Sequence, residues 1–302
     1  MNAVVVGGGS WGTAFAKLLR ERGHEATLAV RDPARDYPYG LEPVAVEDAP
    51  FDDAEVVVVA VPSSAFRAVV EAIPGDAPIL SLTKGLDPAT GERLSTLVRG
   101  RSVAVLSGPN MAEEVAAGLP GATVIASEDE DLALRLQEAV NSLAFRVYVN
   151  TDLTGVELCA AAKNVMALAA GGVDGLGLGD NAKAALITRG LVEMARLGEA
   201  LGADSETFSG LAGMGDLIVT CWHPSGRNRR AGELIARGAT PDEARAEIGH
   251  VVEGLTTAPV LRALSYRLGI ELPITEGVCT VLDGLPLSGL VEGLMGRRPT
   301  EE

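Results

Sequence analysis

A stretch of seventeen residues, from Thr154 to Ala170, most constrains the fold of this chain. Its sequence is TGVELCAAAKNVMALAA, which is apolar on nearly every side when it is read at the period of an α-helix. A helix that is hydrophobic all round is buried in a protein core. The stretch therefore predicts a central helix against which the neighbouring elements pack.

Lys163 lies in the middle of this predicted helix. The residues three and four positions away from it include no carboxylate that could pair with its ammonium group. A lysine at such a position can extend its stem along the helix until its charge reaches water. Alternatively, the ammonium group is desolvated, which lowers its pKa and suits it to act as a general base. The adjacent Asn164 and the motifs before and after it favour the second interpretation.

The length and charge of the chain limit the ligands it can bind. With 302 residues, of which 47% are hydrophobic and 22% charged, it is long enough for two globular domains. Its formal net charge of −16 argues against binding to nucleic acid or to an anionic membrane, because both require a basic face. A phosphorylated ligand would have to be met by a local cluster of basic groups.

Three cysteines, Cys159, Cys221 and Cys279, lie far apart and form no CxxC pair. Such sparse cysteines predict a reducing compartment without a disulfide framework or a metal site. The sequence begins directly with a predicted strand, MNAVVV, with neither the basic region nor the long apolar region typical of a signal peptide. No apolar run approaches the roughly 18 residues that would indicate a membrane span. We therefore expect a cytoplasmic protein.

A glycine-rich turn follows the first predicted strand, residues 3–6. It fits the pattern G-x-G-x-x-G, and an amphipathic helix is predicted directly after it, over residues 13–22. In this pattern Gly7 permits a tight turn, Gly9 lets the backbone approach a pyrophosphate, and Gly12 lets the helix pack close to the strand. The helix N-terminus then offers free N–H groups to phosphates. Between a strand and a helix, the pattern predicts a dinucleotide site.

The next predicted strand, residues 26–30, ends in Arg31 and Asp32, which give conflicting indications about the dinucleotide. An acidic residue about 20 positions after the glycine pattern binds the ribose 2′-hydroxyl of NAD, and Asp32 lies at that distance. Arg31 is the residue type that accepts the 2′-phosphate of NADP. Alternatively, Asp32 and Pro33 form a turn in which the aspartate is a cap. The sequence leaves the choice between NAD and NADP open.

Further apolar runs alternate with helical patterns through the first half of the chain. The predicted strands are residues 55–61, 78–82, 103–106, 122–126 and 145–149, and the predicted helices are 64–72, 110–117 and 131–141. Valine-rich strands that alternate with helices are typical of a parallel sheet covered on both faces. We therefore predict an α/β fold whose N-terminal Rossmann-like domain contains a mostly parallel sheet.

Polar residues follow two of these strands, in the segments 81–85 and 107–110. Ligands of parallel sheets bind beyond the carboxyl ends of the strands, so both segments are candidates for a binding site. Lys84 in the first segment is either a solvated loop lysine or a ligand contact, and the sequence does not separate the two.

After Thr151 the strand pattern nearly disappears. Helices are predicted over residues 154–170, 181–201, 230–237, 241–248, 257–266 and 275–282. We therefore expect a dinucleotide-binding domain over residues 1–150 and an all-helical domain, carrying substrate-binding and catalytic residues, over 151–302. The glycine-rich residues 171–179 are expected to form a loop fitted closely against another part of the protein.

A second dense motif lies within residues 210–232, GLAGMGDLIVTCWHPSGRNRRAG. Its basic run opens a predicted helix, and in so acidic a chain this is at least as consistent with an anion site as with a solvated face. Arg227 could hold phosphate oxygens with its guanidinium fork while Asn228 donates from its amide. His223 has no neighbouring pattern that would make it a metal ligand or a catalytic base, so we interpret it as a loop histidine.

These motifs together resemble the bacterial type of NAD(P)-dependent glycerol-3-phosphate dehydrogenase. The resemblance covers nearly the whole chain, and the order and spacing of the blocks are specific to that family. The matching blocks are GGGSWGTA (7–14), TKGL (83–86), SGPNMAEE (107–114), AAAKNVMALAAG (160–171), GLGLGDNAKAALITRGLVEM (175–194), AGMGDLIVTC (212–221), GRNRRAG (226–232) and VVEG (251–254).

The resemblance implies interconversion of sn-glycerol 3-phosphate and dihydroxyacetone phosphate with NAD or NADP, in a role that supplies phospholipid synthesis. Lys163 matches the family's proton-transferring lysine. The residues implied for the substrate site are Lys84, Gly108, Asn110, Asp216, Gly226, Arg227 and Asn228. Those implied for the cofactor site are Gly7, Gly9, Ser10, Trp11, Gly12, Arg31, Lys84, Ala112, Arg227, Val251 and Glu253.

The chemistry of such a reaction fits these residue types. Hydride leaves the carbinol carbon for the nicotinamide while neutral Lys163 takes the hydroxyl proton. Lys84 nearby would help to hold the pKa of Lys163 down, and Asp216 could orient Lys163. Arg227 and Asn228 would anchor the phosphate and thereby fix the alcohol.

The chain departs from the family pattern at several positions. The family usually has Ser or Thr in place of Asn110, Phe in place of Met111, and Ser in place of His223 and Gly226, so two hydroxyl contacts differ. The segment after Arg31 is short and lacks the Asn-containing loop that the family places there. The resemblance therefore identifies fewest contact residues on the adenine side of the cofactor site.

Two other functions are compatible with parts of the sequence. Two-domain dehydrogenases of β-hydroxyacids also carry a lysine, but typically with Asn four residues later, where this chain has Ala167. A non-catalytic NAD(P) sensor would not need Lys163 in a core helix. We also expect a homo-oligomer, with a dimer favoured, in which apolar residues within 284–295 could form the interface.

Overall fold

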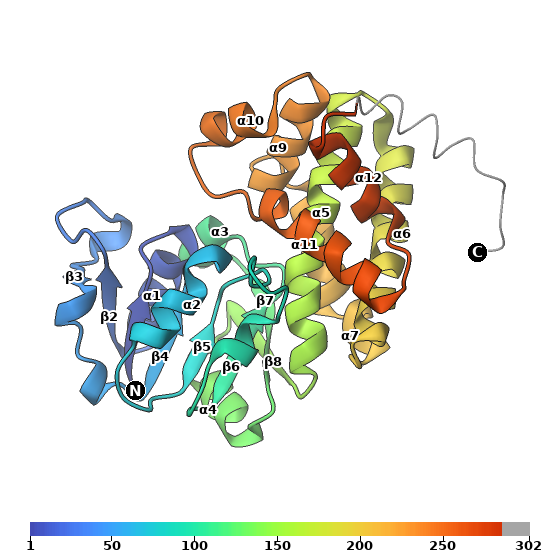
Figure 1. Ribbon diagram of the computed structural model, residues 1–302. Helices are drawn as coiled ribbons and strands as arrows, with labels where there is room; N and C mark the ends of the chain where they lie inside the picture. Colours follow the sequence, from blue (N-terminus) through green and yellow to red (C-terminus); the bar gives the residue numbers. More distant parts are fainter. Residues whose placement is uncertain (286–302) are drawn as a thin grey trace.

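The computed structural model describes residues 1–285 and consists of a sheet-containing part followed by a helical part (Figure 1). One eight-stranded sheet has the order β3-β2-β1-β4-β5-β6-β7-β8. Neighbouring strands are parallel except at the antiparallel pair β6–β7, so the predicted mostly parallel sheet is confirmed. The strands are β1 (Asn2–Val6), β2 (Glu25–Val30), β3 (Val44–Ala45), β4 (Val56–Val59), β5 (Ile79–Ser81), β6 (Val103–Ser107), β7 (Gly121–Ser127) and β8 (Phe145–Asn150).

Both faces of the sheet are covered, as the continuous valine runs predict. One face packs against α1 (Ser10–Glu21) and α4 (Glu130–Val140), whose Phe15 and Leu136 are buried in the same apolar cluster as alternate residues of β1. The other face packs against α2 (Ser63–Ala72), where Phe66 is completely buried. α3 (Ala112–Ala116) follows β6 and packs against α1. Burial on both faces explains why β4 consists of four valines and no polar residue.

The short strand β3 was not predicted. It contains only two residues, both half-buried, and pairs with the end of β2 through Ala29 and Val30. Two residues are too few to show the alternation or the apolar run by which a strand is recognised in a sequence.

The helical part is built around α5 (Leu153–Gly175), which stands between α9 and α6 (Figure 1). Nearly every residue of α5 is buried, as its all-round apolar pattern predicts. Among residues 1–285 it is the one helix long and apolar enough to cross a membrane, and 94% of its apolar window is buried inside the protein. The helices around it are α6 (Gly179–Ala200), α7 (Ser205–Ser209), α8 (Asp216–Trp222), α9 (Arg227–Ala236), α10 (Pro241–Ile248), α11 (Glu253–Leu268) and α12 (Pro273–Leu282).

The prediction of a loop over residues 171–179 was wrong for its first half, because α5 continues to Gly175. The glycines instead allow two helix backbones to meet. A Cβ on Gly171 would lie 1.8 Å from the carbonyl oxygen of Arg229, and a Cβ on Gly232 would lie 1.9 Å from that of Leu168. α5 and α9 therefore pack backbone against backbone, which fixes the position of α9.

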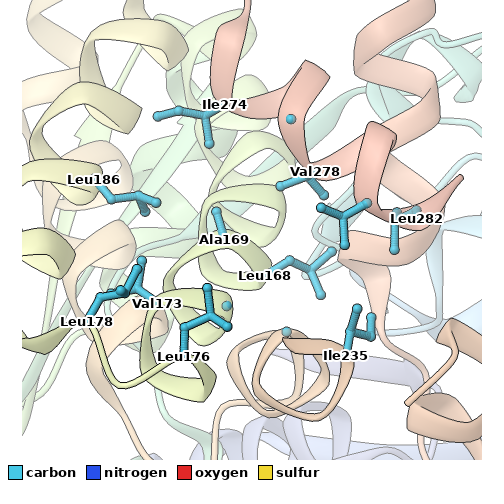
Figure 2. Close-up of a pocket in the computed structure, with 14 residues that line it drawn as sticks. Leu168, Ala169, Val173, Leu176, Leu178, Leu186, Ile235, Ile274, Val278 and Leu282 are labelled. Carbon is cyan, nitrogen blue, oxygen red and sulfur yellow. The ribbon is translucent and has the colours of Figure 1, made fainter. Parts of the chain in front are cut away.

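An apolar cavity of about 100 Å³ lies between α5, α6, α9 and α12 (Figure 2). Leu168, Leu186, Ile235 and Val278 converge on it from these four helices. Its lining contains no titratable side chain. The cavity therefore offers no side chain for proton transfer.

Candidate active site

Two loops that leave the same edge of the sheet bring Lys84 and Gly108 together. β5 and β6 are parallel neighbours that end at Ser81 and Ser107, shortly before these two residues. Lys84 Nζ donates a hydrogen bond to the carbonyl oxygen of Gly108 at 3.1 Å. Lys84 thus lies at the carboxyl ends of the strands and is not a freely solvated loop lysine.

One carboxylate, that of Asp216, binds the ammonium groups of both Lys84 and Lys163. Lys84 Nζ lies 2.7 Å from Oδ2, and Lys163 Nζ lies 2.6 Å from Oδ1. Asp216 is the first residue of α8, and only 1% of Asp216 and 5% of Lys163 are exposed. Lys163 also donates to Thr220 Oγ1 at 2.9 Å. Lys163 is therefore desolvated and paired across helices, and its stem does not run along α5 to water.

Burial and these neighbours set the charge of the cluster. Burial lowers the pKa of Lys163 to about 7; the Asp216 carboxylate opposes this shift and the Lys84 ammonium adds to it. Burial of Asp216 acts to raise its pKa, but the two ammonium groups outweigh burial and hold that pKa below its usual range. Asp216 is thus ionised at neutral pH, while Lys163 can gain or lose a proton there.

Asn164 connects this cluster to the start of α9. Its Nδ2 donates to the carbonyl oxygens of Lys84 and Ala160, each at 3.3 Å. Its Oδ1 accepts a hydrogen bond from Asn228 Nδ2 at 2.9 Å. Asn228 Oδ1 in turn accepts from the backbone N–H of Gly254 at 2.9 Å. Asn228 is therefore held in place by α5 and α11.

The N-terminus of α9 has features that suit an anion. Arg227 is its first residue, and Gly226 occupies the N-cap position without a side chain that could accept from the first-turn N–H groups. No acidic residue lies in the first turn. The exposed Arg227 guanidinium donates to the carbonyl oxygen of Val251 at 3.1 Å. The free N–H groups, the helix dipole and a guanidinium converge on this point.

Asn110 is bound to strand β7. Its Nδ2 donates to the carbonyl oxygen of Ala122 at 3.1 Å, and its Oδ1 accepts from Thr123 Oγ1 at 2.9 Å. The amide therefore anchors the 107–110 loop beside Gly108. Asn110 lies at the predicted substrate site, and both the nitrogen and the oxygen of its side-chain amide form hydrogen bonds within the protein.

The glycine-rich turn has the geometry that a dinucleotide needs. Gly7 has a φ of +122°, and a Cβ there would lie 2.3 Å from the carbonyl oxygen of Ala60. A Cβ on Gly12 would lie 2.0 Å from the carbonyl oxygen of Gly7, whereas a Cβ on Gly9 would meet nothing within 4 Å. Gly7 and Gly12 are thus required by packing of the turn, and Gly9 leaves open space in front of the helix N-terminus.

Residues next to this turn complete the candidate cofactor site. Ser10, the exposed first residue of α1, precedes Trp11, whose indole N–H is the one buried side-chain polar atom without a hydrogen-bond partner among residues 1–285. Ala112, the first residue of α3, is buried beside Trp11. An unpaired buried donor and an open cradle at Gly9 both fit the binding of a polar ligand here.

The end of β2 does not resolve the choice of dinucleotide. Asp32 Oδ1 accepts a hydrogen bond from the N–H of Ala34 at 3.2 Å, so the aspartate makes the turn contact that was one of its two interpretations. Arg31 and Asp32 are both exposed. Both side chains therefore stay accessible, Asp32 to a ribose hydroxyl and Arg31 to a 2′-phosphate.

Glu253 lies between the two parts of the protein. Its carboxylate accepts from the backbone N–H of Ser63 at 3.0 Å and from Ser63 Oγ at 2.6 Å. Glu253 is the first residue of α11 and Ser63 the first of α2, so the carboxylate caps the N-terminus of α2. Val251, two residues earlier, is exposed.

Two residues of the site, Thr220 and Ser63, were not identified from the sequence. Thr220 lies four residues after Asp216, so a helix across this segment would have placed both side chains on one face. That helix, α8, was not predicted. Ser63 could not be paired with Glu253, because 190 residues separate them.

His223 lies in the loop between α8 and α9, as predicted, where its Nδ1 lies 2.9 Å from Ser225 Oγ. Within residues 1–285 no group of three or more His, Cys, Asp or Glu side chains is placed to hold a metal ion. The three cysteines are free and buried.

Comparison with known proteins identifies relatives along the whole chain. A family model described as the C-terminus of NAD-dependent glycerol-3-phosphate dehydrogenase matches residues 152–288, and one described as its N-terminus matches residues 2–37 and 37–133. The chain is 43% identical to the NAD(P)+ glycerol-3-phosphate dehydrogenase of Corynebacterium glutamicum, over 99% of this chain and 98% of that protein. The corresponding protein of Symbiobacterium thermophilum is 46% identical over 100% of this chain and 96% of its own length.

A solved structure gives the same result for the fold. The crystal structure of glycerol-3-phosphate dehydrogenase from Coxiella burnetii superposes with a TM-score of 0.93 at 37% sequence identity, covering 98% of this chain and 99% of that chain.

Proposed function

The chain belongs to the family of NAD-dependent glycerol-3-phosphate dehydrogenases, and we propose that it interconverts sn-glycerol 3-phosphate and dihydroxyacetone phosphate. The cofactor is NAD or NADP, with the preference open, as in the names of its relatives. The observation that carries the proposal is the buried cluster in which Asp216 pairs with both Lys84 and Lys163.

Lys163 is the proton acceptor and donor of this reaction. In the oxidising direction neutral Lys163 takes the proton of the substrate hydroxyl, and in the reducing direction its ammonium form returns it. A pKa of about 7 keeps both forms populated near neutral pH. Asp216 and Thr220 orient Nζ, and Asp216 stabilises the charged form. When bound, the nicotinamide cofactor accepts or supplies the hydride at the carbon that bears this oxygen.

The substrate phosphate binds at the start of α9. Arg227 offers two parallel N–H groups to phosphate oxygens, the uncapped first turn offers backbone N–H groups, and Asn228 lies beside them. Gly226 adds backbone but no hydroxyl. These groups supply local positive potential in a chain whose net charge is −16. Lys84, Gly108 and Asn110 line the opposite side of the substrate.

The dinucleotide binds at the glycine-rich turn. Gly7, Gly9, Gly12, Ser10 and Trp11 form the cradle for the pyrophosphate, and the open space at Gly9 supports this assignment. The remaining contacts come from Arg31, Lys84, Ala112, Arg227, Val251 and Glu253.

Residues 1–150 thus serve as the dinucleotide domain and residues 151–302 as the substrate and catalytic domain. We assign the protein to the cytoplasm, which agrees with three free cysteines, and to the supply of glycerol 3-phosphate for phospholipid synthesis. A homodimer is the favoured assembly; the apolar residues proposed for its interface, within 284–295, lie almost wholly outside the described residues.

The direct test is absorbance at the reduced nicotinamide band, with purified protein, dihydroxyacetone phosphate, and NADPH or NADH in parallel. A decrease that depends on dihydroxyacetone phosphate is the expected result, and the ratio of the two rates measures the preference set around Arg31 and Asp32. No decrease with either cofactor, from folded protein that still binds one of them, would overturn the proposal.

A further inference from the structure

Arg229, from α9, holds two backbone carbonyl groups of the loop between α8 and α9. Its Nε donates to the carbonyl oxygen of His223 at 3.2 Å, and its Nη2 donates to that of Pro224 at 3.0 Å. Only 12% of the Arg229 side chain is exposed. Since this loop leads directly into Gly226 and Arg227, Arg229 determines where the first turn of α9 begins.

Arg229 is itself fixed by Asp174, which lies in the last turn of α5. Arg229 Nη1 lies 2.5 Å from Asp174 Oδ2, and Lys183 Nζ lies 2.8 Å from the same oxygen. Glu233 also approaches the guanidinium, at 3.3 Å, but it comes from α9 itself. Asp174 is thus the carboxylate that ties Arg229 to a different helix.

The buried Lys183 occupies the other side of Asp174. Its Nζ lies 4.9 Å from the ring centre of Trp222, the last residue of α8. Burial acts to raise the pKa of Asp174, but hydrogen bonds from Lys183 and Arg229 outweigh it and hold the pKa below its ordinary value. Asp174 therefore stays ionised across the neutral pH range and keeps its ion pair with Arg229.

α5 carries both Lys163 and Asp174, eleven residues apart on one continuous helix. At 1.5 Å per residue this corresponds to about 16 Å along the helix axis. The contact of Gly171 with the backbone of Arg229 prevents α9 from sliding along α5. The helix therefore fixes the start of α9 relative to the ammonium group of Lys163.

We propose that Asp174 is a positioning residue for the substrate phosphate, acting through Arg229 on the 223–226 loop and the first turn of α9. This inference rests on the proposed function. Asp174 touches neither the substrate nor the cofactor in this scheme. It holds the phosphate site in place relative to Lys163, which lies on the same helix, so its effect is confined to substrates that carry the phosphate.

The test compares Asp174→Asn with the wild type on two ketones. Asparagine keeps the size of the side chain but loses the charge that holds Arg229. We expect KM for dihydroxyacetone phosphate to rise about tenfold, equivalent to about 1.4 kcal/mol, and the inhibition constant of inorganic phosphate to rise by a similar factor. For dihydroxyacetone, which lacks the phosphate, kcat/KM should stay within about twofold, as should the dissociation constant of the cofactor.

Two further variants separate the partners of Asp174. Arg229→Lys replaces three nitrogens, each of which contacts a different acceptor, with a single ammonium nitrogen, so it should reproduce the effect of Asp174→Asn. Lys183→Met removes the other partner while leaving the pair of Asp174 with Arg229, so KM for dihydroxyacetone phosphate should change little. If Asp174→Asn does not fold, Arg229→Lys provides the same measurement.

The outcomes distinguish this inference from the proposed function. If the wild type reduces dihydroxyacetone phosphate and Asp174→Asn leaves its KM unchanged, or slows both ketones equally, the positioning role is wrong. The same follows if Lys183→Met alone reproduces the defect. If the wild type itself does not act on dihydroxyacetone phosphate, the proposed function fails first.

Discussion

At the scale of single residues, the proposed activity depends on keeping Lys163 buried while letting it change its charge. Burial alone would leave the amine neutral at all but low pH, and a close carboxylate alone would keep it protonated. Asp216 divides its two oxygens between Lys163 and Lys84, so its attraction for Lys163 is partly offset by the second cation. The pKa of about 7 is the balance of these opposing effects.

Replacing Lys163 with Met removes the proton acceptor and keeps the apolar stem. We expect kcat to fall by about 10² to 10⁴, the range that general acid–base groups contribute. Asp216 keeps its contact with Lys84, so the fold and the cofactor dissociation constant, measured by titration calorimetry, should be retained. A kcat within tenfold of the wild type would contradict the role of Lys163.

The pH dependence of turnover should have opposite signs in the two directions. Oxidation needs neutral Lys163, so its kcat should rise as the pH passes through about 7, whereas reduction needs the ammonium form and should decline there. Lys84→Met removes a cation that lowers the pKa of Lys163. The rise in kcat for oxidation and the fall in kcat for reduction should therefore both move to higher pH. The profile is measured at saturating substrate, because Lys84 also lies in the proposed substrate site.

The control for this shift is Lys17→Met, which removes a surface lysine paired with Glu21. It should leave the pH dependence of kcat unchanged in both directions. A profile of Lys84→Met that coincides with the wild type, or moves to lower pH, would show that Lys84 does not act on the charge of Lys163.

At the scale of elements, glycines have two distinct uses in this protein. Some allow close packing of backbone segments, as Gly12 does in the first turn of α1 and Gly232 does between α5 and α9. Gly9 differs, because a side chain there would meet only open space. Packing glycines should govern stability, and Gly9 should govern the approach of a ligand.

A matched pair of alanine variants tests this division. Gly12→Ala pushes a Cβ toward the carbonyl oxygen of Gly7 and should lower the free energy of unfolding by about 1 to 3 kcal/mol. Gly9→Ala should leave the thermal midpoint unchanged while raising KM for the cofactor about tenfold, since a methyl group would occupy the space of the pyrophosphate. Equal losses of stability in both variants would contradict the assignment.

The same contrast explains how far the sequence predicts the structure. Valine runs such as β4 and the apolar pattern of α5 determine their elements locally, so both were predicted. The extension of α5 through Gly171 to Gly175 was not, because glycine disfavours a helix and only packing against α9 overrides that preference. The glycine turn and Lys163 were identified from residue types, whereas the pair of Lys163 with Asp216 was reached only through family resemblance, since 53 residues separate them.

At the scale of the whole molecule, two carboxylates join the sheet-containing part to the helical part in addition to Asp216, which pairs with Lys84. Glu253 caps α2 through Ser63. Glu157, on α5, is 4% exposed and accepts hydrogen bonds from the N–H of Ser95 at 2.8 Å and from Arg93 at 3.0 Å. Both links cross from residues before 100 to residues after 150, so the two parts should unfold together.

Arg93→Met tests the second link. It leaves Glu157 buried without its cation, and we expect the free energy of unfolding at about pH 8 to fall by about 2 kcal/mol, less than for a fully buried pair because Arg93 is 23% exposed. The measurement is chemical denaturation followed by far-ultraviolet circular dichroism, with Arg245→Met at an exposed pair as the control.

The sign of the pH dependence follows from burial. Burial raises the pKa of Glu157, so the folded state holds a proton at a pH where the unfolded chain has already lost it, and stability falls as the pH rises. Removing Arg93 raises that pKa further. The destabilisation should therefore be larger at about pH 8 than at about pH 5; the reverse order would exclude the pair as its cause.

The protein contains two tryptophans, and each lies beside one of the two proposed binding regions. Trp11 lies within the glycine-rich pattern, between Gly9 and Gly12, with its indole N–H unpaired. Trp222 lies under Lys183 at the start of the loop that leads to Arg227. Each ligand consequently has its own intrinsic fluorophore. With Trp11 replaced by Phe, emission should report only on phosphate, and with Trp222 replaced by Phe, only on dinucleotide. The order in which the two ligands bind could then be followed optically, without any label.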